Sequence, residues 1–298
     1  MAKSKFRKLP RHIQVILAVI VVVVIAVSWY MQNQPVMLPE GEMVVTMIDV
    51  GNADSFLIQC GAQSMLIDAG ERGDSDTVLD ALEENGVKTL DYVIATHADS
   101  DHIGGMQEVI ENIEVKNYIM AFMPQGHTPT TKTYINLLGA VDTLDIPLIE
   151  AQVGSHFTLG EARVDILGPA DDFEDKNNQS VVCKVTFGEK KFLFMGDAET
   201  QAEEALLATG ADLRADVLKA GHHGSSTSST QALLDRVKPQ IVLVPCGADN
   251  AYGHPHREFL KRMQNLQVEM YRADVNGTVQ LRCDGKTIEV VPQKGEAA

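Results

Sequence analysis

The fold and the chemistry of this sequence are decided by one stretch, residues 96–105, which reads Thr-His-Ala-Asp-Ser-Asp-His-Ile-Gly-Gly. A strand-like run, residues 92–95, precedes it, and a helix-like run, residues 103–110, follows it. Two histidines and two aspartates therefore lie within six residues at the carboxyl end of a strand. Because a divalent metal removes the repulsion between such groups and gives them a common partner, we expect a metal site here. The alternative is a polar loop that caps the following helix.

The N-terminal part of the chain differs in composition from the rest. Residues 1–12 contain five Lys or Arg and no acidic residue, and residues 13–30 are almost entirely apolar. This pattern is typical of a membrane helix or of a signal sequence. The aromatic pair Trp29 and Tyr30 favours an uncleaved anchor, whereas the small residues at 26–28 suit signal cleavage. The sequence thus predicts a basic cytoplasmic segment (1–12), a transmembrane anchor or signal sequence (13–31) and a linker (32–42), with the remaining chain outside the cell.

The chain beyond this segment is strongly acidic. It contains all 41 acidic residues against 20 of the 25 basic ones, a formal charge of −21. Such a charge argues against broad affinity for nucleic acid. Any phosphate ligand therefore has to be attracted by bound metal and by a local basic patch.

The four cysteines give no sign of a zinc ribbon, because none of them forms a Cys-x-x-Cys pair. Cys60, Cys183 and Cys283 lie in apolar or strand-like surroundings, where buried thiols are the usual state. A location outside the cell would permit disulfides, but the spacing does not pair them.

The order of strand-like and helix-like segments indicates an α/β domain over residues 43–292, followed by a short tail at 293–298. Strands fall into two groups with helices between them, which suggests two sheets flanked by helices.

The stretch 96–105 resembles the metal-binding motif of the metallo-β-lactamase superfamily, His-x-His-x-Asp-His, with Asp99 in place of the second histidine. The aspartate variant, followed by Ile-Gly-Gly, is similar to the nuclease-like domain of the ComEC competence proteins. The opening Ile-Asp-Val-Gly-Asn-Ala-Asp-Ser, residues 48–55, and Gly-His-Pro-His, residues 253–256, resemble that domain too. The resemblance runs from about Met43 to Val291 and implies an αββα sandwich with two divalent metal ions.

The resemblance also implies the metal ligands. His97 and Asp99 belong to one metal, Asp101 and His102 belong to the other, and Asp197 corresponds to a bridging aspartate. A histidine after a later strand completes the set, and of the adjacent pair His222 is preferred to His223 because it comes first after the strand. The ligands implied by the resemblance are therefore His97, Asp99, Asp101, His102, Asp197 and His222 or His223.

One position of the family pattern is missing. Where a further histidine is usual, residues 176–180 read Lys-Asn-Asn-Gln-Ser, and Asn178 is a candidate to contribute an oxygen or to hold a water. The first metal site would then be rich in oxygen, which favours Mn²⁺ or a similar hard ion over Zn²⁺.

Three further features bear on the substrate. Ser225 and Ser226 lie in a hydroxyl-rich loop before a helix, where hydroxyls and free backbone N–H groups can bind phosphate, although a mobile loop explains them equally well. Arg257 and Lys261 are four residues apart and share a helix face. His254 is a candidate proton donor to a leaving group or a phosphate. Asp101 and Asp197 are the other two candidate catalytic residues.

Together these features predict a membrane-anchored, extracellular metal-dependent hydrolase. The leading activity is that of a nuclease or phosphodiesterase linked to DNA uptake or processing, with DNA or another phosphodiester as its partner. Two alternatives stay open, a small-molecule hydrolase of lactones or esters and a non-catalytic accessory module for DNA uptake.

Overall fold

The structure is a computed structural model that describes residues 10–32 and 38–297. The chain divides between residues 36 and 37 into two units, which are described separately. The first contains helix α1 (Arg11–Gln32), which includes all of the predicted anchor and begins two residues before it. Within the described residues, no helix has both the length and the hydropathy required to cross a membrane. The transmembrane helix predicted over residues 13–31 is therefore not confirmed, and residues 1–9 and 33–37 lie outside the described residues.

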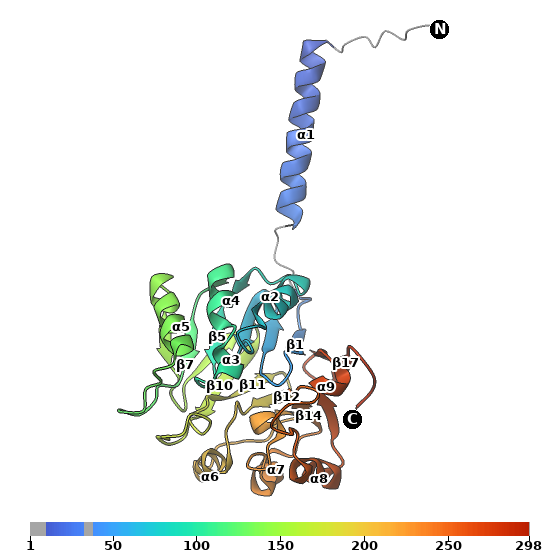
Figure 1. Ribbon diagram of the computed structural model, residues 1–298. Coiled ribbons are helices and arrows are strands. Elements are labelled where there is room, and N and C mark those ends of the chain that lie inside the picture. The colour runs from blue at the N-terminus through green and yellow to red at the C-terminus, as the bar shows by residue number, and fades with distance from the viewer. Residues whose placement is uncertain (1–9, 33–37, 298) are drawn as a thin grey trace. The chain divides into compact units, whose positions relative to one another are not determined.

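The second unit is built on two mixed β-sheets (Figure 1). The strands of the first sheet, in spatial order, are β17 (Ile288–Pro292), β16 (Val279–Cys283), β1 (Met43–Met47), β2 (Phe56–Cys60), β3 (Gln63–Ile67), β5 (Tyr92–Ala95), β7 (Tyr118–Met120) and β8 (Leu148–Glu150). The strands of the second are β15 (Glu269–Arg272), β14 (Ile241–Val244), β13 (Val217–Lys219), β12 (Lys190–Phe194), β11 (Val182–Phe187), β10 (Ala162–Gly168) and β9 (His156–Leu159). A short pair, β4 (Thr89–Leu90) and β6 (Glu114–Val115), lies apart from both.

The two sheets face each other across one apolar core, and helices cover their outer faces. Phe56 of β2 and Phe194 of β12 meet in the core with ring centroids 5.4 Å apart. The helices over the first sheet are α2 (Ser75–Glu84), α4 (Met106–Asn112) and α5 (Lys132–Thr143). Those over the second are α6 (Thr200–Ala208), α7 (Gln231–Val237) and α8 (Arg257–Leu266). The predicted arrangement of two sheets flanked by helices is confirmed. Central strands such as β1 and β2 are buried on both faces, as strands between a core and a helix layer must be.

The carboxyl ends of strands from both sheets meet at one end of the sandwich. β5 runs parallel to β3 and β7 in the first sheet, and β12, β13 and β14 are parallel in the second. The two sheets are joined there by a backbone hydrogen bond from Val181 N to Thr96 O, 2.8 Å long. Ligands of α/β proteins bind beyond the carboxyl ends of parallel strands, so this end is where a site is expected.

The helix expected over residues 103–110 is broken into α3 (Ser100–Ile103) and α4. The break falls at Gly104 and Gly105, which pack directly against the backbone of the turn after β3. A Cβ at Gly105 would lie 2.4 Å from the carbonyl oxygen of Ala69, closer than atoms can approach. The two glycines therefore let the 96–105 stretch lie against its neighbour, a constraint that helical periodicity does not reveal.

The four cysteines are free and buried, as expected for Cys60, Cys183 and Cys283 from their apolar surroundings. Two further helical elements are as short as α3: α9 (Ala273–Asn276) and the 3₁₀ turn η1 (Gly221–Gly224), which follows β13.

Gly105→Ala should destabilise the domain, because the added methyl group has no room beside Ala69. Overpacking of this kind costs about 1–3 kcal/mol, equivalent to a fall in Tm of several degrees for a domain of this size. The matched control is Gly139→Ala in α5, where an added Cβ meets nothing within 4 Å. Alanine there should stabilise the helix by up to about 1 kcal/mol. Thermal unfolding of both variants checks the assignment, and equal Tm values would contradict it.

Candidate metal centre

Four buried side chains form a compact cluster at the end of the sandwich where the strands meet. Asp54 precedes β2, His102 lies in α3 after β5, Asp197 follows β12, and His223 lies in η1 after β13. One ligand-type atom from each lies within 4.8 Å of those of the other three. Segments far apart in the sequence are brought together here, and the cluster is consistent with a metal site.

Asp101 extends this cluster on its open side. His102 Nε2 lies 3.3 Å from Asp197 Oδ2, and His223 Nε2 lies 3.5 Å from the same oxygen. Asp101 Oδ2 is 3.2 Å from His223 Nε2 and 3.9 Å from His102 Nε2. Two imidazole nitrogens and two carboxylate oxygens therefore converge on one small volume, which is the donor set of a nitrogen- and oxygen-ligated divalent ion.

The hydrogen bonds behind the two imidazoles orient them as ligands. His102 Nδ1 lies 2.7 Å from Asp68 Oδ2, and His223 Nδ1 lies 2.8 Å from the carbonyl oxygen of Pro245. An Nδ1–H donated backward leaves the Nε2 lone pair pointing at the cluster, as in metal-bound histidines. His102 Nε2 is buried and has no hydrogen-bond partner. The residues present therefore fit a divalent cation.

The charges of the cluster attract cations strongly. Burial alone would lower the pKa of His223, but Asp197, Asp101 and Asp54 raise it to about 10. Burial would raise the pKa of Asp101, yet its hydrogen bond to His223 and the charge of His102 hold that pKa well below its usual value. Protons and a divalent cation thus compete for the same carboxylate and imidazole groups.

Asp197 also touches a buried lysine. Lys219, at the end of β13, is 1% exposed, and its Nζ donates to the carbonyl oxygen of Gly196 over 2.6 Å. It pairs with Asp54 and lies 3.3 Å from Asp197 Oδ1. Burial would lower the pKa of Lys219, but Asp54 and Asp197 raise it, so the ammonium group stays charged.

An open cleft of about 570 Å³ reaches this cluster at Asp101, Asp197 and His223. Ser225 and Ser226 line the cleft, as does His254. The structure therefore brings these three predicted substrate-binding or catalytic residues near the compact cluster. The other lining residues are Asn52, Asp99, Ser100, Asp101, Asn177, Asp197, Glu199, His222, His223, Thr227, Tyr252 and His256.

The comparisons with known proteins agree with this geometry. The family model of the metallo-beta-lactamase superfamily matches residues 48–247, two thirds of the chain. The chain belongs to this superfamily. It is 30% identical to ComE operon protein 3 of Bacillus subtilis over 280 residues and to Competence protein ComA of Neisseria gonorrhoeae over 261 residues. These matches cover 87% and 86% of the chain but 35% of each relative, so the chain spans about a third of their length.

One solved structure has a fold similar to that of this chain. CmlA, a diiron beta-hydroxylase from Streptomyces venezuelae, has a TM-score of 0.53 and 16% sequence identity. The match covers 83% of this chain and 55% of CmlA. At this identity the likeness shows the fold alone.

The structure distinguishes the adjacent histidines of the superfamily motif. His223 is 1% exposed and belongs to the compact cluster, whereas the His222 side chain is 24% exposed. His222 Nδ1 lies 2.8 Å from Glu199 Oε1, and its Nε2 lies 3.7 Å from Asp197 Oδ2. Both residues have left-handed backbone conformations, which carry the second histidine, rather than the first, into the cluster. His223 is therefore better placed than the preferred His222.

The other predicted ligand pair lies beside the cluster. His97 is buried with its ring centroid 4.1 Å from that of His102, and its Nε2 has no hydrogen-bond partner. Burial and the neighbouring His102 lower the pKa of His97 to about 3, so the imidazole is neutral. Asp99 Oδ2 lies 3.6 Å from His97 Nε2, while Asp99 Oδ1 is paired with Lys176.

Asn178 does not offer the oxygen that its place in the sequence suggested. Its Oδ1 accepts hydrogen bonds from Glu199 N and Ala202 N, at 3.2 and 3.1 Å, at the start of α6. The hydroxyl of Ser180 accepts from Asp197 N over 3.0 Å. These side chains hold the Asp197 turn and the helix after it in place, which is a structural role.

The predicted substrate residues differ in their surroundings. His254 Nδ1 is buried without a hydrogen-bond partner, and burial together with His223 and His222 lowers the pKa of His254 to about 4. At neutral pH His254 is therefore a neutral imidazole that can donate one N–H. Ser226 N already donates to His256 Nδ1 over 2.9 Å. Arg257 and Lys261 are exposed on α8 and do not line the cleft, so their role stays a prediction.

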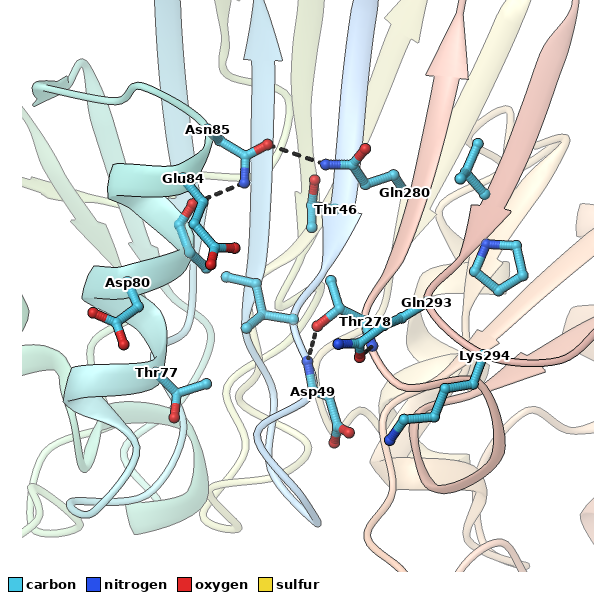
Figure 2. A pocket seen from close by; sticks show the side chains of 14 residues that line it. Thr46, Asp49, Thr77, Asp80, Glu84, Asn85, Thr278, Gln280, Gln293 and Lys294 are labelled. Atoms are coloured by element: carbon cyan, nitrogen blue, oxygen red, sulfur yellow. Dashed lines mark hydrogen bonds between the residues drawn. The ribbon is translucent and has the colours of Figure 1, made fainter. Parts of the chain in front are cut away.

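A second cavity, of about 630 Å³, lies away from this site (Figure 2). It opens between α2, which contributes Asp80 and Glu84, and the strands that carry Thr46 and Gln280. Its lining contains no histidine or cysteine, in contrast to the smaller cleft, which is lined by four histidines.

Sequence reasoning missed two members of the centre. They are Asp54, which lies in the opening stretch 48–55, and Lys219. The available signals are an acidic residue two positions before the buried strand β2 and a lysine at the end of the buried strand β13, because a charge at a buried strand end needs a partner.

Asp68→Asn should weaken metal binding without unfolding the chain. Asp68 accepts hydrogen bonds from Thr96 N and Oγ1 and holds His102 Nδ1. Loss of such an orienting carboxylate costs about 10- to 100-fold in metal affinity. The control is Asp91→Asn, another buried carboxylate, which pairs with Lys116 and does not line the cleft. Calorimetric titration with Mn²⁺ and Zn²⁺ measures both, and an unchanged affinity in Asp68→Asn would show that this hydrogen bond does not orient the ligand.

Proposed function

We propose that this protein is a metal-dependent hydrolase of phosphodiesters, of the nuclease type, that acts in the uptake or processing of DNA. The observation that carries the proposal is the convergence of His102 Nε2, His223 Nε2 and the carboxylates of Asp101 and Asp197 beside an open cleft, which His223 and both carboxylates line. Membership of the superfamily supports hydrolysis, and the names of the two competence relatives support DNA as the substrate class.

A divalent cation held here would lower the pKa of a water molecule and offset negative charge that develops in the reaction. Asp101 and Asp197 would hold the cation together with His102 and His223. The neutral His254 faces the same cleft, 5.8 Å from His223 between ring centroids, and can orient a phosphate oxygen through its N–H. Ser225 and Thr227 add hydroxyl groups on the same side.

The charge of the cleft restricts how an anionic substrate binds. Its lining includes Asp99, Asp101, Asp197 and Glu199 but no lysine or arginine. Phosphate must therefore be attracted by the bound cation and by side chains at the rim. Arg257 and Lys261 are the proposed rim residues, because α8 begins directly after His256, which lines the cleft.

Asp197→Asn should abolish hydrolysis, a loss of at least about 100-fold, because it removes the negative charge of the carboxylate that faces both His102 and His223 in the proposed cation site. The matched control is Asp216→Asn, which lies at the opposite end of β13 and pairs with Lys190. Single- and double-stranded DNA, bis-p-nitrophenyl phosphate and a lactone serve as substrates with Mn²⁺ or Zn²⁺. Metal-dependent lactone turnover without phosphodiester cleavage would reject the nuclease proposal. Metal binding without turnover of any substrate would favour an accessory module.

For location, we propose that the N-terminal segment attaches the domain to the outer face of a membrane. Five basic residues precede an apolar run, and the apolar side chains from Val15 to Ile25 are exposed on α1. A continuous apolar surface of this kind needs a cover of lipid or protein. After cell fractionation the full chain should sediment with membranes, and protease added to intact cells should remove the domain. Recovery in the soluble fraction, or protection of the domain, would contradict the proposal.

A further inference from the structure

The donors predicted for the first metal site are mostly engaged with the protein itself. Asp99 Oδ1 is paired with the ammonium group of Lys176. The Asn178 oxygen, in the segment that replaces the usual histidine, accepts two backbone N–H groups of α6. Of this set, His97 Nε2 is buried and uncommitted. Asp99 Oδ2 lies 3.6 Å from it, and these two donors are too few to hold a divalent ion, which takes three or four protein donors in a stable site.

The bridging position of Asp197 is engaged in the same way. Asp197 Oδ2 faces His102 and His223, at 3.3 and 3.5 Å, whereas Asp197 Oδ1 faces Lys219 Nζ at 3.3 Å. A carboxylate that joins two metal ions has to offer an oxygen to each. Here the second oxygen already faces a cation that is 1% exposed and is tied to Asp54 and to the carbonyl oxygen of Gly196.

We propose that the centre binds one divalent ion tightly, on the His102–His223 side, and that Lys219 and Lys176 supply fixed positive charge on the His97 side in place of a second ion. This rests on the proposed metal-dependent function, because it concerns the same cluster. Lys219 holds Asp197 from beneath and acts as a positioning residue. Lys176, whose side chain is 38% exposed, neutralises Asp99 at the wall of the cleft.

The arrangement follows from charge. A second divalent ion beside Lys219 and Lys176 would meet two ammonium groups at short range, and it would have to displace them from Asp197 and Asp99. Each displacement exposes a buried or half-buried charge that is now paired. The second ion should therefore bind at least about tenfold more weakly than the first, since like charges a few ångströms apart repel by more than 1.4 kcal/mol at a protein surface.

Counting the metal ions tests the proposal without an activity measurement. The full chain is stripped with a chelator, dialysed against increasing Mn²⁺, and assayed for bound metal and for its electron paramagnetic resonance spectrum. One Mn²⁺ per chain with the six-line spectrum of an isolated ion is the expected result. Two ions of equal affinity with a spin-coupled spectrum would overturn the proposal and leave the hydrolase function standing. The absence of any metal binding would contradict both the one-ion proposal and the proposed metal-dependent hydrolase function.

Lysine variants locate the positive charge. Lys176→Met should raise the affinity of a second Mn²⁺ about tenfold, because Asp99 becomes free. Lys116→Met is the matched control, since Lys116 is similarly exposed and pairs with Asp91 away from the cleft. If Lys176→Met leaves the affinity for a second Mn²⁺ unchanged, Lys176 has no part in excluding that ion. Lys219→Met should likewise admit a second ion if it folds, and if it does not fold, the wild-type count and Lys176→Met still decide.

Discussion

The buried carboxylate of Asp197 is the group on which the centre depends. Its two oxygens face the imidazoles of His102 and His223 on one side and the ammonium of Lys219 on the other. A carboxylate that is 2% exposed needs such compensation, because an unpaired buried charge costs several kcal/mol. These partners meet only if β5 of one sheet and β12 and β13 of the other end at the same place. The sheet arrangement and the charge compensation therefore require each other.

Orientation of the ligands is set from inside the protein. Asp68 and the carbonyl of Pro245 hold the Nδ1 atoms of the two histidines, and Asp68 is itself held by Thr96 at the end of β5. Each of these groups is buried and satisfied by the next, so the network is stable only as a whole. Asp101 and His254 lie on the open side and line the cleft. They do not belong to this buried network, so they can contact a ligand in the cleft.

The sequence predicted the layers of the fold and most of the cleft, because those depend on local patterns. Apolar runs marked the buried strands, and His97 to His102 marked the turn after β5. It preferred His222 to His223, because it could not reveal the two left-handed backbone conformations in η1 that bring His223 into the compact cluster. Nor could it show that the Asn178 oxygen caps α6, or that Asp54 and Lys219 meet from positions 165 residues apart. Such facts depend on long-range packing, which periodicity does not encode.

The charge of the domain links metal binding to substrate binding. The chain beyond residue 12 has a formal charge of −21, and the cleft is lined by carboxylates without a lysine or arginine. Lys219 cannot serve an anionic ligand directly, because it is buried and its charge is balanced by Asp54 and Asp197. A phosphodiester would therefore be repelled from the cleft until a divalent cation is in place. Under the proposed function, a divalent cation held by these ligands would both attract the anion to the cleft and support hydrolysis, and a change of the ligands would remove both effects.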